Sequence, residues 1–554
     1  MRHLAVGRAR LLGVGPLLAS VIFVAAACGD DETFSGPIEA TVTHYDYAFD
    51  IDSRAAHATV TATVDTAGDC FSLPMRAPLV GGTATFDGKP ATSATADGTT
   101  LTVCSDGGTD GPDVTIGVDV TIPLETLSTS QVGYSKTVDG SGNPFYYLVS
   151  WVGGCDRFGP CDNRPNVFAT YTFTVTHPET MQVACSGTLA TPSPTQTTCT
   201  FDHDGGPTYS TFGVAAYPTA AWVATDKGMW GSVHATVFAR PQTLVADAIE
   251  TAHHDGFMRY MESTFGAYPY GTELRVYAAP TYWAGFEHPG SIVLDDSLGR
   301  AANQAGRHTL DHEIVHQWAG DETTLADTYD FVWKESMAEY LTFTYEAMVD
   351  VPAADRTVAG WKSGSAGAAF FPVPGEKPAL FDYYGDAYGP GPMILFRQIE
   401  RMSSREQVIA ALKTLLGEPR ALSVDDVIAA LETSTGLDLD AYANAWIKGT
   451  GVPAWPTVVA TYAAGSLHVQ VTAGGDRRCK FSIALVGANP GESQLVDVNT
   501  FTGGIDQTIA VTPAFAVTTT QIDPLRECLV YPATTVKPAR VNPWLSPRAL
   551  GVTE

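Results

Sequence analysis

Two histidines in the middle of the chain stand at a spacing that suits a metal ion. Residues 312–316 read His-Glu-Ile-Val-His. On a helix, positions i and i+4 differ by about 40° in direction, so the imidazoles of His312 and His316 project from one face and can reach one ion. Glu313 is turned by about 100° from His312, which suits it to a water on the metal rather than to the metal itself. The motif predicts a zinc site with a general base beside it.

A glutamate further along supplies the third ligand. Glu335 follows His316 after eighteen residues, in a segment, 332–340, that reads as a second helix. Two histidines and one glutamate leave the fourth zinc position for water. We therefore expect one Zn²⁺ per chain on His312, His316 and Glu335, the alternative being histidines on a polar helix face with no metal. Glu339 could accept a hydrogen bond from a ligand imidazole, but we expect it to be exposed at the surface.

These residues resemble the gluzincin aminopeptidases of the aminopeptidase N and leukotriene hydrolase type. That family has H-E-x-x-H followed after eighteen residues by Glu, as residues 312–335 do. Its second motif, G-A-M-E-N, has its counterpart in residues 284–288, which read Ala-Gly-Phe-Glu-His. The resemblance implies that Glu287 holds the free α-ammonium of a peptide substrate. It also implies that Gly285 and Phe286 line the pocket for the first side chain.

A tyrosine of the family stabilises the oxyanion of the reaction. It stands in a Y-x-K-G context, and Tyr388 lies at the matching distance, with Pro390 in place of Lys. Tyr383 and Tyr384 are alternatives. The resemblance implies a zinc-dependent aminopeptidase in which Glu313 takes the proton of the attacking water and Tyr388 stabilises the tetrahedral oxyanion. Peptides with a free N-terminus are then the substrates.

Two residues beside the zinc glutamate depart from the family pattern, because Lys334 and Ser336 replace the usual Asn and Gly. Two other functions stay open. An endopeptidase on the same scaffold is expected if Glu287 does not bind the amine. A cell-surface binding protein that has lost catalysis is the other alternative, although the intact zinc ligands and Glu313 weigh against it.

The N-terminus is typical of an export signal. Three arginines in residues 1–10 precede a stretch of apolar and small residues, 11–27, that ends in three alanines before Cys28. This pattern resembles a bacterial lipoprotein signal over residues 1–27, with Cys28 acylated and residues 28–38 as a tether. An ordinary secretory signal is the alternative. We expect an exported protein, lipid-anchored to a bacterial cell membrane on its periplasmic or cell-surface side.

Eight further cysteines in an exported protein are expected to form disulfides. Sequence does not fix their pairing, but each neighbouring pair falls in one apparent β region. The predicted disulfides are Cys70–Cys104, Cys155–Cys161, Cys185–Cys199 and Cys479–Cys528.

The pattern around the zinc motif predicts a multidomain α+β protein. Residues 39–238 alternate with period two and predict an N-terminal antiparallel β-domain. Residues 239–453 are mostly helical and form the catalytic domain, which the resemblance implies is thermolysin-like. Residues 454–535 return to alternation and predict a small C-terminal β-sandwich domain, with residues 536–554 as a tail.

Capping signals place two of the helices in the catalytic domain. Ser403 with Glu406 predicts one helix start, and Ser423 with Asp426 predicts another, with Gly436 at its end.

Composition excludes one class of partner. The 554 residues are 45% apolar and 17% charged, which is typical of folded chains, and their formal net charge is −28. An acidic chain is unsuited to nucleic acid, so we expect no nucleic-acid partner.

Overall fold

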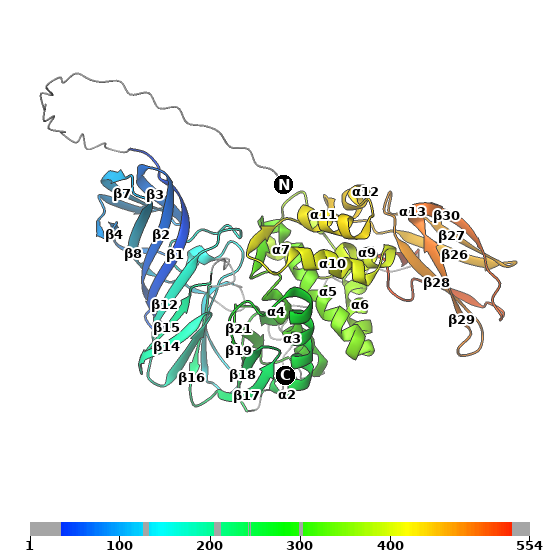
Figure 1. Cartoon of the computed structure of the whole chain (residues 1–554), viewed down its shortest axis with the longest axis horizontal. Helices are drawn as coiled ribbons and strands as arrows, with labels where there is room; N and C mark the ends of the chain where they lie inside the picture. The colour runs from blue at the N-terminus through cyan, green and yellow to red at the C-terminus, as the bar shows by residue number, and fades with distance from the viewer. Residues whose placement is uncertain are drawn as a thin grey trace, which may run out of the picture.

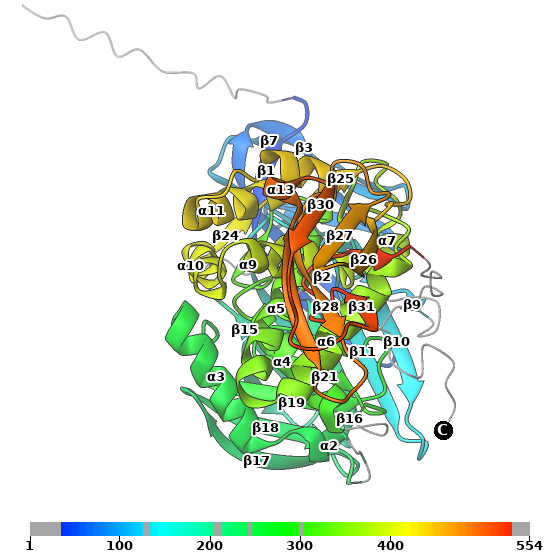
Figure 2. The same ribbon diagram turned by 90° about the vertical axis from the view of Figure 1, so that its right-hand side faces the viewer.

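The computed structural model describes residues 35–125, 132–203, 212–241, 243, 245–298 and 303–533. Figure 1 shows an N-terminal β region at the left, a central region of helices and one sheet, and a C-terminal β region at the right. Figure 2 shows the molecule turned by 90°, with the strands of the C-terminal region in front. Cys28, the predicted signal and the predicted tail lie outside the described residues. No helix among the described residues is long and apolar enough to cross a membrane.

The N-terminal region is built on one large, mixed sheet. Its strands in spatial order are β14 (Thr188–Ser193), β15 (Gln196–Phe201), β12 (Thr170–Thr176), β1 (Glu39–Asp50), β2 (Ala55–Thr66), β8 (Asp113–Thr121), β4 (Leu79–Phe86) and β5 (Lys89–Pro90). Strands β1 and β12 run parallel. The predicted all-antiparallel domain is therefore wrong at this pair, because period-two alternation reports which face is buried and not the direction of the neighbouring strand.

Two smaller sheets complete the N-terminal region. One contains β13 (Met181–Cys185), β16 (Gly213–Pro218), β11 (Pro144–Val149), β10 (Gly133–Val138) and β9 (Leu124–Glu125). The other contains β3 (Gly68–Pro74), β7 (Thr100–Thr109) and β6 (Ser93–Ala96). A short 3₁₀ turn, Cys155–Arg157, follows β11. Apolar side chains of β11 and β16 enter the same hydrophobic core as the central region, so these two regions pack directly on each other.

The central region, predicted as mostly helical from residue 239, contains a sheet that begins before that residue. Its strands in spatial order are β17 (Val223–Trp230), β18 (Val233–Ala239), β19 (Glu273–Ala279), β21 (Ser291–Asp295) and β20 (Gly285–Phe286). Strand β18 pairs in parallel with β19, and β19 with β21. The predicted boundary between residues 238 and 239 cuts through this sheet, because β17 and β18 look like their N-terminal neighbours in sequence but pair with strands after them. The central region starts at β17.

The rest of the central region is mostly helical, and its helices carry most of the predicted catalytic residues. They are α2 (Val245–Ala248), α3 (Thr251–Phe265), α4 (Asn303–His316), α5 (Phe331–Val349), α6 (Val351–Ala366), α7 (Leu380–Ala387), α8 (Pro390–Pro392), α9 (Gln398–Met402), α10 (Arg405–Leu415), α11 (Val424–Thr435) and α12 (Asp440–Tyr442). A 3₁₀ turn (Thr328–Asp330) and two π-helical turns (Met393–Arg397 and Ala443–Ile447) connect them. The region also contains two short pairs of parallel strands. These are β22 (Thr323–Leu325) with β24 (Arg420–Leu422), and β23 (Val373–Pro374) with β25 (Lys448–Gly449).

Helix α5 lies at the centre of this arrangement. Residues 331–346 of the helix are all buried. A helix that is apolar around most of its circumference is covered on every side, and α5 contacts α4, α6, α8 and α11. Glutamates on such a helix must therefore find partners inside the protein.

The capping signals are partly confirmed. Ser423 and Asp426 form the predicted capping box of α11, and Gly436 ends that helix in a left-handed conformation. The N-cap of α10 is Ser404 rather than Ser403: its side chain accepts a hydrogen bond from the backbone N–H of Gln407. Two adjacent serines satisfy the same sequence signal, so the signal leaves the start uncertain by one residue.

The C-terminal region contains two sheets that share one core with the helices. One sheet has β30 (Asp506–Ala510), β27 (Ser466–Val471), β26 (Thr457–Ala463) and β32 (Tyr531–Pro532), and the other has β29 (Ser493–Asn499), β28 (Lys480–Val486) and β31 (Thr519–Ile522). A short helix, α13 (Thr500–Gly503), follows β29.

The disulfides of the structure are Cys70–Cys104, Cys155–Cys161, Cys185–Cys199 and Cys479–Cys528, the pairs that neighbour pairing predicts. All four lie in the β regions, so the region that carries α4 and α5 contains no cysteine.

Candidate active site

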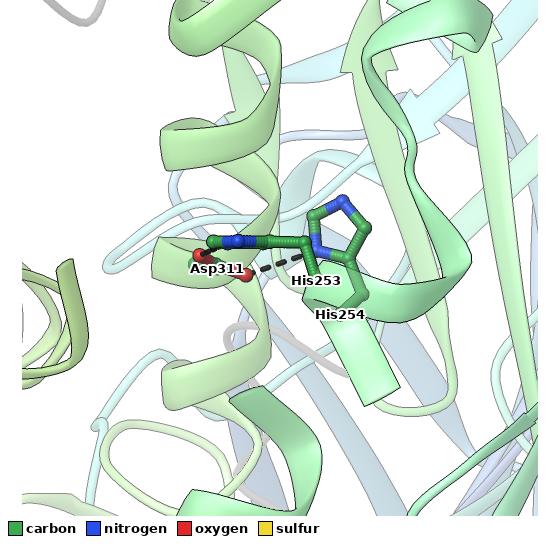
Figure 3. A group of neighbouring side chains, drawn as sticks. All are labelled: His253, His254 and Asp311. Carbon is green, nitrogen blue, oxygen red and sulfur yellow. Dashed lines mark hydrogen bonds and ion pairs between the residues drawn. The ribbon is translucent and has the colours of Figure 1, made fainter. Parts of the chain in front are cut away.

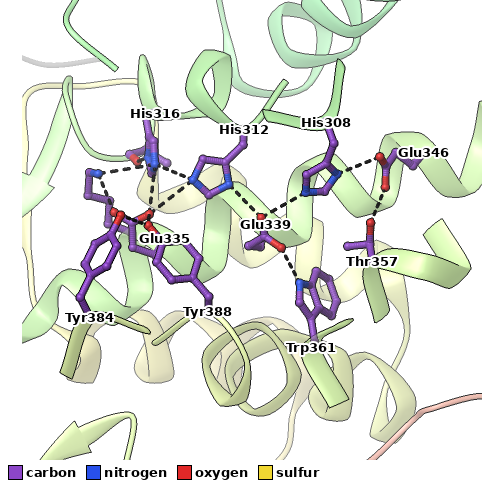
Figure 4. A network of polar contacts seen from close by, with 12 residues as sticks. His308, His312, His316, Glu335, Glu339, Glu346, Thr357, Trp361, Tyr384 and Tyr388 are labelled. Atoms are coloured by element: carbon purple, nitrogen blue, oxygen red, sulfur yellow. Dashed lines mark hydrogen bonds and ion pairs between the residues drawn. The ribbon is translucent and has the colours of Figure 1, made fainter. Parts of the chain in front are cut away.

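Helices α4 and α5 bring the three predicted metal ligands together (Figure 4). The Nε2 atoms of His312 and His316 lie 3.0 Å apart, and each lies 3.4 Å from Glu335 Oε2. Donor atoms at 2.0–2.1 Å from one tetrahedral zinc ion lie about 3.3 Å from one another. All three side chains are buried, and their two nitrogens and one oxygen are donor types that zinc prefers. The residues present therefore fit a zinc ion.

The other nitrogen of each imidazole is fixed by a hydrogen bond. His316 Nδ1 donates to the carbonyl oxygen of Ala319 at 3.0 Å, and His312 Nδ1 donates to Glu339 Oε1 at 3.0 Å. A proton on Nδ1 leaves the lone pair of Nε2 for a metal. Glu339 is buried, so the expectation that it is exposed is wrong: α5 is covered on all sides, and the face that carries Glu339 meets α4.

A buried network extends from the ligands toward α6 (Figure 4). His308, one helical turn before His312, contacts Glu339 Oε1 at 3.3 Å and Glu346 Oε1 at 2.8 Å. The indole N–H of Trp361 on α6 donates to the second oxygen of Glu339. Each oxygen of Glu339 thus has a partner, which is how a buried carboxylate avoids an uncompensated charge.

Glu313, which follows His312 on α4 and is turned from it by about 100°, reaches the same cavity. Burial, together with the negative charges of Glu287 and Glu335, raises the pKa of Glu313. A Cβ atom on Gly285 would lie 2.2 Å from Glu313 Oε1 and 2.7 Å from its Cδ. Gly285, predicted to line the first pocket, therefore makes room for the general base.

The predicted amine-binding residue also lies at this cavity. Glu287 is buried, and its Oε1 lies 2.9 Å from the Nζ of Lys334, which lies 2.8 Å from Glu335 Oε1. The contact between Glu287 Oε1 and Lys334 Nζ is a buried ion pair. Gln317 fixes the backbone nearby: its Nε2 donates to the carbonyl of Glu287 at 2.7 Å, and its Oε1 accepts from Gly290 N–H at 2.8 Å.

Of the three candidate tyrosines, the structure brings two to the metal ligands. The Tyr388 hydroxyl donates to Glu335 Oε2 at 2.7 Å, and the Tyr384 hydroxyl contacts that of Tyr388. Tyr383 points elsewhere, because its hydroxyl donates to the carbonyl of Pro372. Tyr388 is thus the candidate closest to the ligands, with Tyr384 behind it.

The cavity that these residues enclose is small, with a volume of about 10 Å³, which is room for about one water molecule. The residues that line this cavity are Trp151, Trp283, Gly285, Phe286, Glu287, His312, Glu313, His316, Lys334, Glu335, Tyr384 and Tyr388. Every predicted metal, catalytic and substrate-binding residue is in this set. Trp151 comes from the N-terminal region, so that region forms part of the wall.

The surroundings of the cavity shift the pKa values of Glu335 and Glu313 in opposite directions. Burial would raise the pKa of Glu335, but Lys334 and His316 hold it well below its usual value. Glu335 is therefore ionised, as a metal ligand must be. Glu313 has a raised pKa and exchanges a proton more readily near neutral pH, as a general base and acid requires.

A second cluster of metal-type donors lies behind α4, where His253 and His254 of α3 meet Asp311 (Figure 3). His253 Nε2 lies 2.6 Å from Asp311 Oδ2, and His254 Nδ1 lies 2.9 Å from Oδ1. Each imidazole uses its own carboxylate oxygen, and both contacts are shorter than the separation of about 3.3 Å around one zinc ion. The cluster is a buried hydrogen-bonded clamp between α3 and α4.

Comparisons with known proteins place this site in context. No protein-family model matches the chain. The chain is similar to aminopeptidase N of Streptomyces lividans, with 24% identity over 327 residues, which are 52% of this chain and 36% of that protein. It is also similar to aminopeptidase A of Gloydius brevicauda, with 24% identity over 366 residues, 59% of this chain and 37% of that protein. The chain thus spans little more than a third of the length of either relative.

Structural alignment with solved structures identifies the fold. An M1 zinc metallopeptidase mutant from Deinococcus radiodurans, bound to a Tyr-Ser-Ala substrate, aligns with a TM-score of 0.60 and 20% identity over 75% of this chain and 95% of that chain. The chain has the M1 metallopeptidase fold. Aminopeptidase A of Legionella pneumophila, in complex with aspartic acid, aligns with a TM-score of 0.70 and 14% identity over 90% of this chain and 60% of that chain.

Within the M1 fold, the sequence pointed to Glu339 as a partner of a ligand imidazole but not to the other residues around the ligands. His308, His312 and His316 recur every four residues and share one face of α4, a signal that could have pointed to His308. Gln317 gave no such signal, and Lys334 stood out only as a departure from the family pattern. Their roles depend on the backbone of residues 287–290 and on the carboxylates of other elements, which the sequence does not place.

Proposed function

We propose that this protein is a zinc-dependent aminopeptidase, which removes amino acids from peptides that have a free N-terminus. One observation carries the proposal: a single small cavity contains the zinc-type donor set, the general base Glu313 and a second buried acid, Glu287. The M1 fold and the similarity to aminopeptidases N and A support it.

The metal and Glu313 divide the chemistry of hydrolysis between them. His312, His316 and Glu335 would hold a zinc ion, which would supply a Lewis acid able to lower the pKa of a water molecule toward about 7 and to polarise the scissile carbonyl. Glu313 takes the proton of the attacking water and passes it to the leaving amine. Its raised pKa suits both steps.

Tyr388 and Glu287 act on the substrate. The hydroxyl of Tyr388, already beside the ligand Glu335, donates a hydrogen bond to the oxyanion that forms on the substrate. Glu287 captures the α-ammonium and so presents only the first peptide bond to Glu313. This restriction makes the protein an exopeptidase.

The test compares free and blocked N-termini. The zinc-loaded protein should release the first residue of a short peptide and should leave the N-acetylated peptide uncut. Glu287→Gln should raise KM for the free peptide about tenfold or more, because a charge-assisted hydrogen bond is lost. Equal cleavage of both peptides by the wild-type protein would support the alternative of an endopeptidase. The ion pair between Glu287 and Lys334 favours that alternative, because it engages the carboxylate that would bind the amine.

We also propose that the protein is exported and anchored through a lipid on Cys28. The sequence of residues 1–27 and the four disulfides support this, since disulfides persist in oxidising compartments. Metabolic labelling with a radioactive fatty acid should mark the wild-type protein in the membrane fraction. Cys28→Ser should lose the label, and a labelled Cys28→Ser variant would contradict the proposal.

A further inference from the structure

Lys334 places a positive charge in the pocket that the proposed function assigns to the N-terminus of the substrate. Its Nζ lies 2.9 Å from Glu287 Oε1 and 2.8 Å from Glu335 Oε1, and only 2% of its side chain is exposed. The aminopeptidases that the motif resembles carry an uncharged Asn at this position. The chain therefore provides an ammonium group of its own where a substrate would bring one.

The position of Lys334 is built into the fold. A Cβ atom on Gly320 would lie 2.6 Å from Lys334 Cε and 3.1 Å from its Cγ and Cδ. Gly320 thus leaves the space in which the stem of the lysine lies. A stem seated against backbone in this way directs the ammonium to one place, instead of leaving it to sample many rotamers.

The ammonium and a metal ion use different oxygens of Glu335. Lys334 contacts Oε1, whereas the imidazoles of His312 and His316 face Oε2. The Nζ of Lys334 also lies 3.5 Å from His316 Nε2, so the ammonium borders the metal position as well as Glu287.

Lys334 changes the net charge of the cavity. Glu287, Glu313 and Glu335 all line it, and buried charges need compensation. With a divalent ion bound and all three acids ionised, Lys334 makes the site neutral before any substrate arrives. An uncharged residue at this position leaves one negative charge for the α-ammonium to neutralise.

We propose that Lys334 determines specificity by competing with the α-ammonium of the substrate for Glu287. This inference rests on the aminopeptidase function proposed above. A peptide N-terminus must displace the lysine ammonium or bind beside it, and like charges placed side by side weaken binding. Lys334 thereby raises KM for substrates with a free N-terminus and narrows the preference for free over blocked N-termini.

Binding of a simple amine tests the competition without catalysis. The probe is n-butylamine, titrated calorimetrically into zinc-free and zinc-loaded protein. Lys334→Met keeps an unbranched stem against Gly320 without the charge, and Lys334→Gln is a second uncharged variant. Both should bind the amine about tenfold more tightly than the wild-type protein, because the like charge is gone. Lys334→Arg keeps the charge and should bind it like the wild-type protein.

Glu287 provides the internal control. In Lys334→Met/Glu287→Gln the gain in amine affinity should disappear, because the competition is for Glu287. In assays with aminoacyl arylamides, Lys334→Met should lower KM about tenfold.

Two results would overturn the inference. One is unchanged amine affinity in folded Lys334→Met and Lys334→Gln proteins that still bind one zinc ion. The other is a tighter-binding Lys334→Arg. The proposed function fails by a different result, namely a zinc-loaded wild-type protein that cuts no substrate with a free N-terminus.

Discussion

At the residue scale, each buried acid of the site has a task that its surroundings set. Glu335 is held ionised by Lys334 and His316, whereas burial and neighbouring negative charges raise the pKa of Glu313. Two carboxylates in one cavity thus serve as ligand and as proton carrier. The same residue types would do neither task in a solvated position, where their pKa values would be ordinary.

Gly285 sets the position of the general base, and its substitution gives the first prediction. Gly285→Ala places a Cβ where the Glu313 carboxylate lies, so kcat should fall at least about tenfold, since small displacements of a catalytic group are costly. Zinc content should stay at one ion per chain. Gly360→Ala is the matched control, because a Cβ there meets no atom within 4 Å. Full activity of Gly285→Ala would contradict the assigned geometry.

Glu339 orients a ligand imidazole, and its substitution gives the second prediction. Glu339→Gln should weaken zinc binding about 10- to 100-fold, because His312 Nδ1 loses its charged partner. Competition with a chelator measures the change. Glu346→Gln, which alters the next carboxylate of the network without touching a ligand, should have a much smaller effect. Equal zinc affinity in the wild-type protein and Glu339→Gln would show that this contact does not matter.

At the element scale, the site depends on how α4 is held against its neighbours. The spacing of His312 and His316 predicts their shared helix face from geometry alone. The burial of Glu339 could not be predicted, because it follows from the packing of α5 against α4 and α6. For the same reason the predicted domain boundary lies too late: β17 and β18 have the alternation of the preceding strands, but β18 pairs with the later strand β19.

The clamp between α3 and α4 gives a prediction about stability. Asp311→Asn leaves His253 and His254 without a charged partner, so the free energy of unfolding should fall by about 3 kcal/mol or more. Urea unfolding measures it. Asp255→Asn, on the helix α3 that carries His253 and His254 but partly exposed, should cost less than about 1 kcal/mol. A second zinc ion per chain in the wild-type protein, lost in Asp311→Asn, would contradict a clamp made of hydrogen bonds alone.

At the scale of the whole molecule, the N-terminal region completes the site. Tyr147 of β11 contacts His288 Nε2 at 2.9 Å, and a Cβ on Gly213 of β16 would lie 2.1 Å from the His288 ring. The segment that carries Glu287 therefore lies where the central region packs against the N-terminal region. The residue types of the M1 motifs are readable in the sequence, but this contact joins residues far apart in the chain and needs the fold.

Acid should destabilise the molecule partly through Glu339. Burial would raise the pKa of Glu339, but His308 and His312 lower it from 4.5 to about 2. A lowered pKa stabilises the folded state above pH 4.5, by about 3 kcal/mol, and this contribution is lost as the pH falls toward 2. Urea unfolding of the zinc-free protein and of Glu339→Gln should show a difference in stability that shrinks over this range. A difference that is constant with pH would contradict the assignment.

The central claim is that one zinc ion and Glu313 remove the first residue of a peptide. Mass spectrometry of the products from an unblocked peptide tests it most directly, with wild-type protein, chelator-treated protein and Glu313→Gln that all retain their fold. We expect stepwise loss of N-terminal residues with the zinc-loaded wild-type protein, at least about 10³-fold less with Glu313→Gln, and none after chelation. Internal cleavage, or full activity of Glu313→Gln, would contradict it.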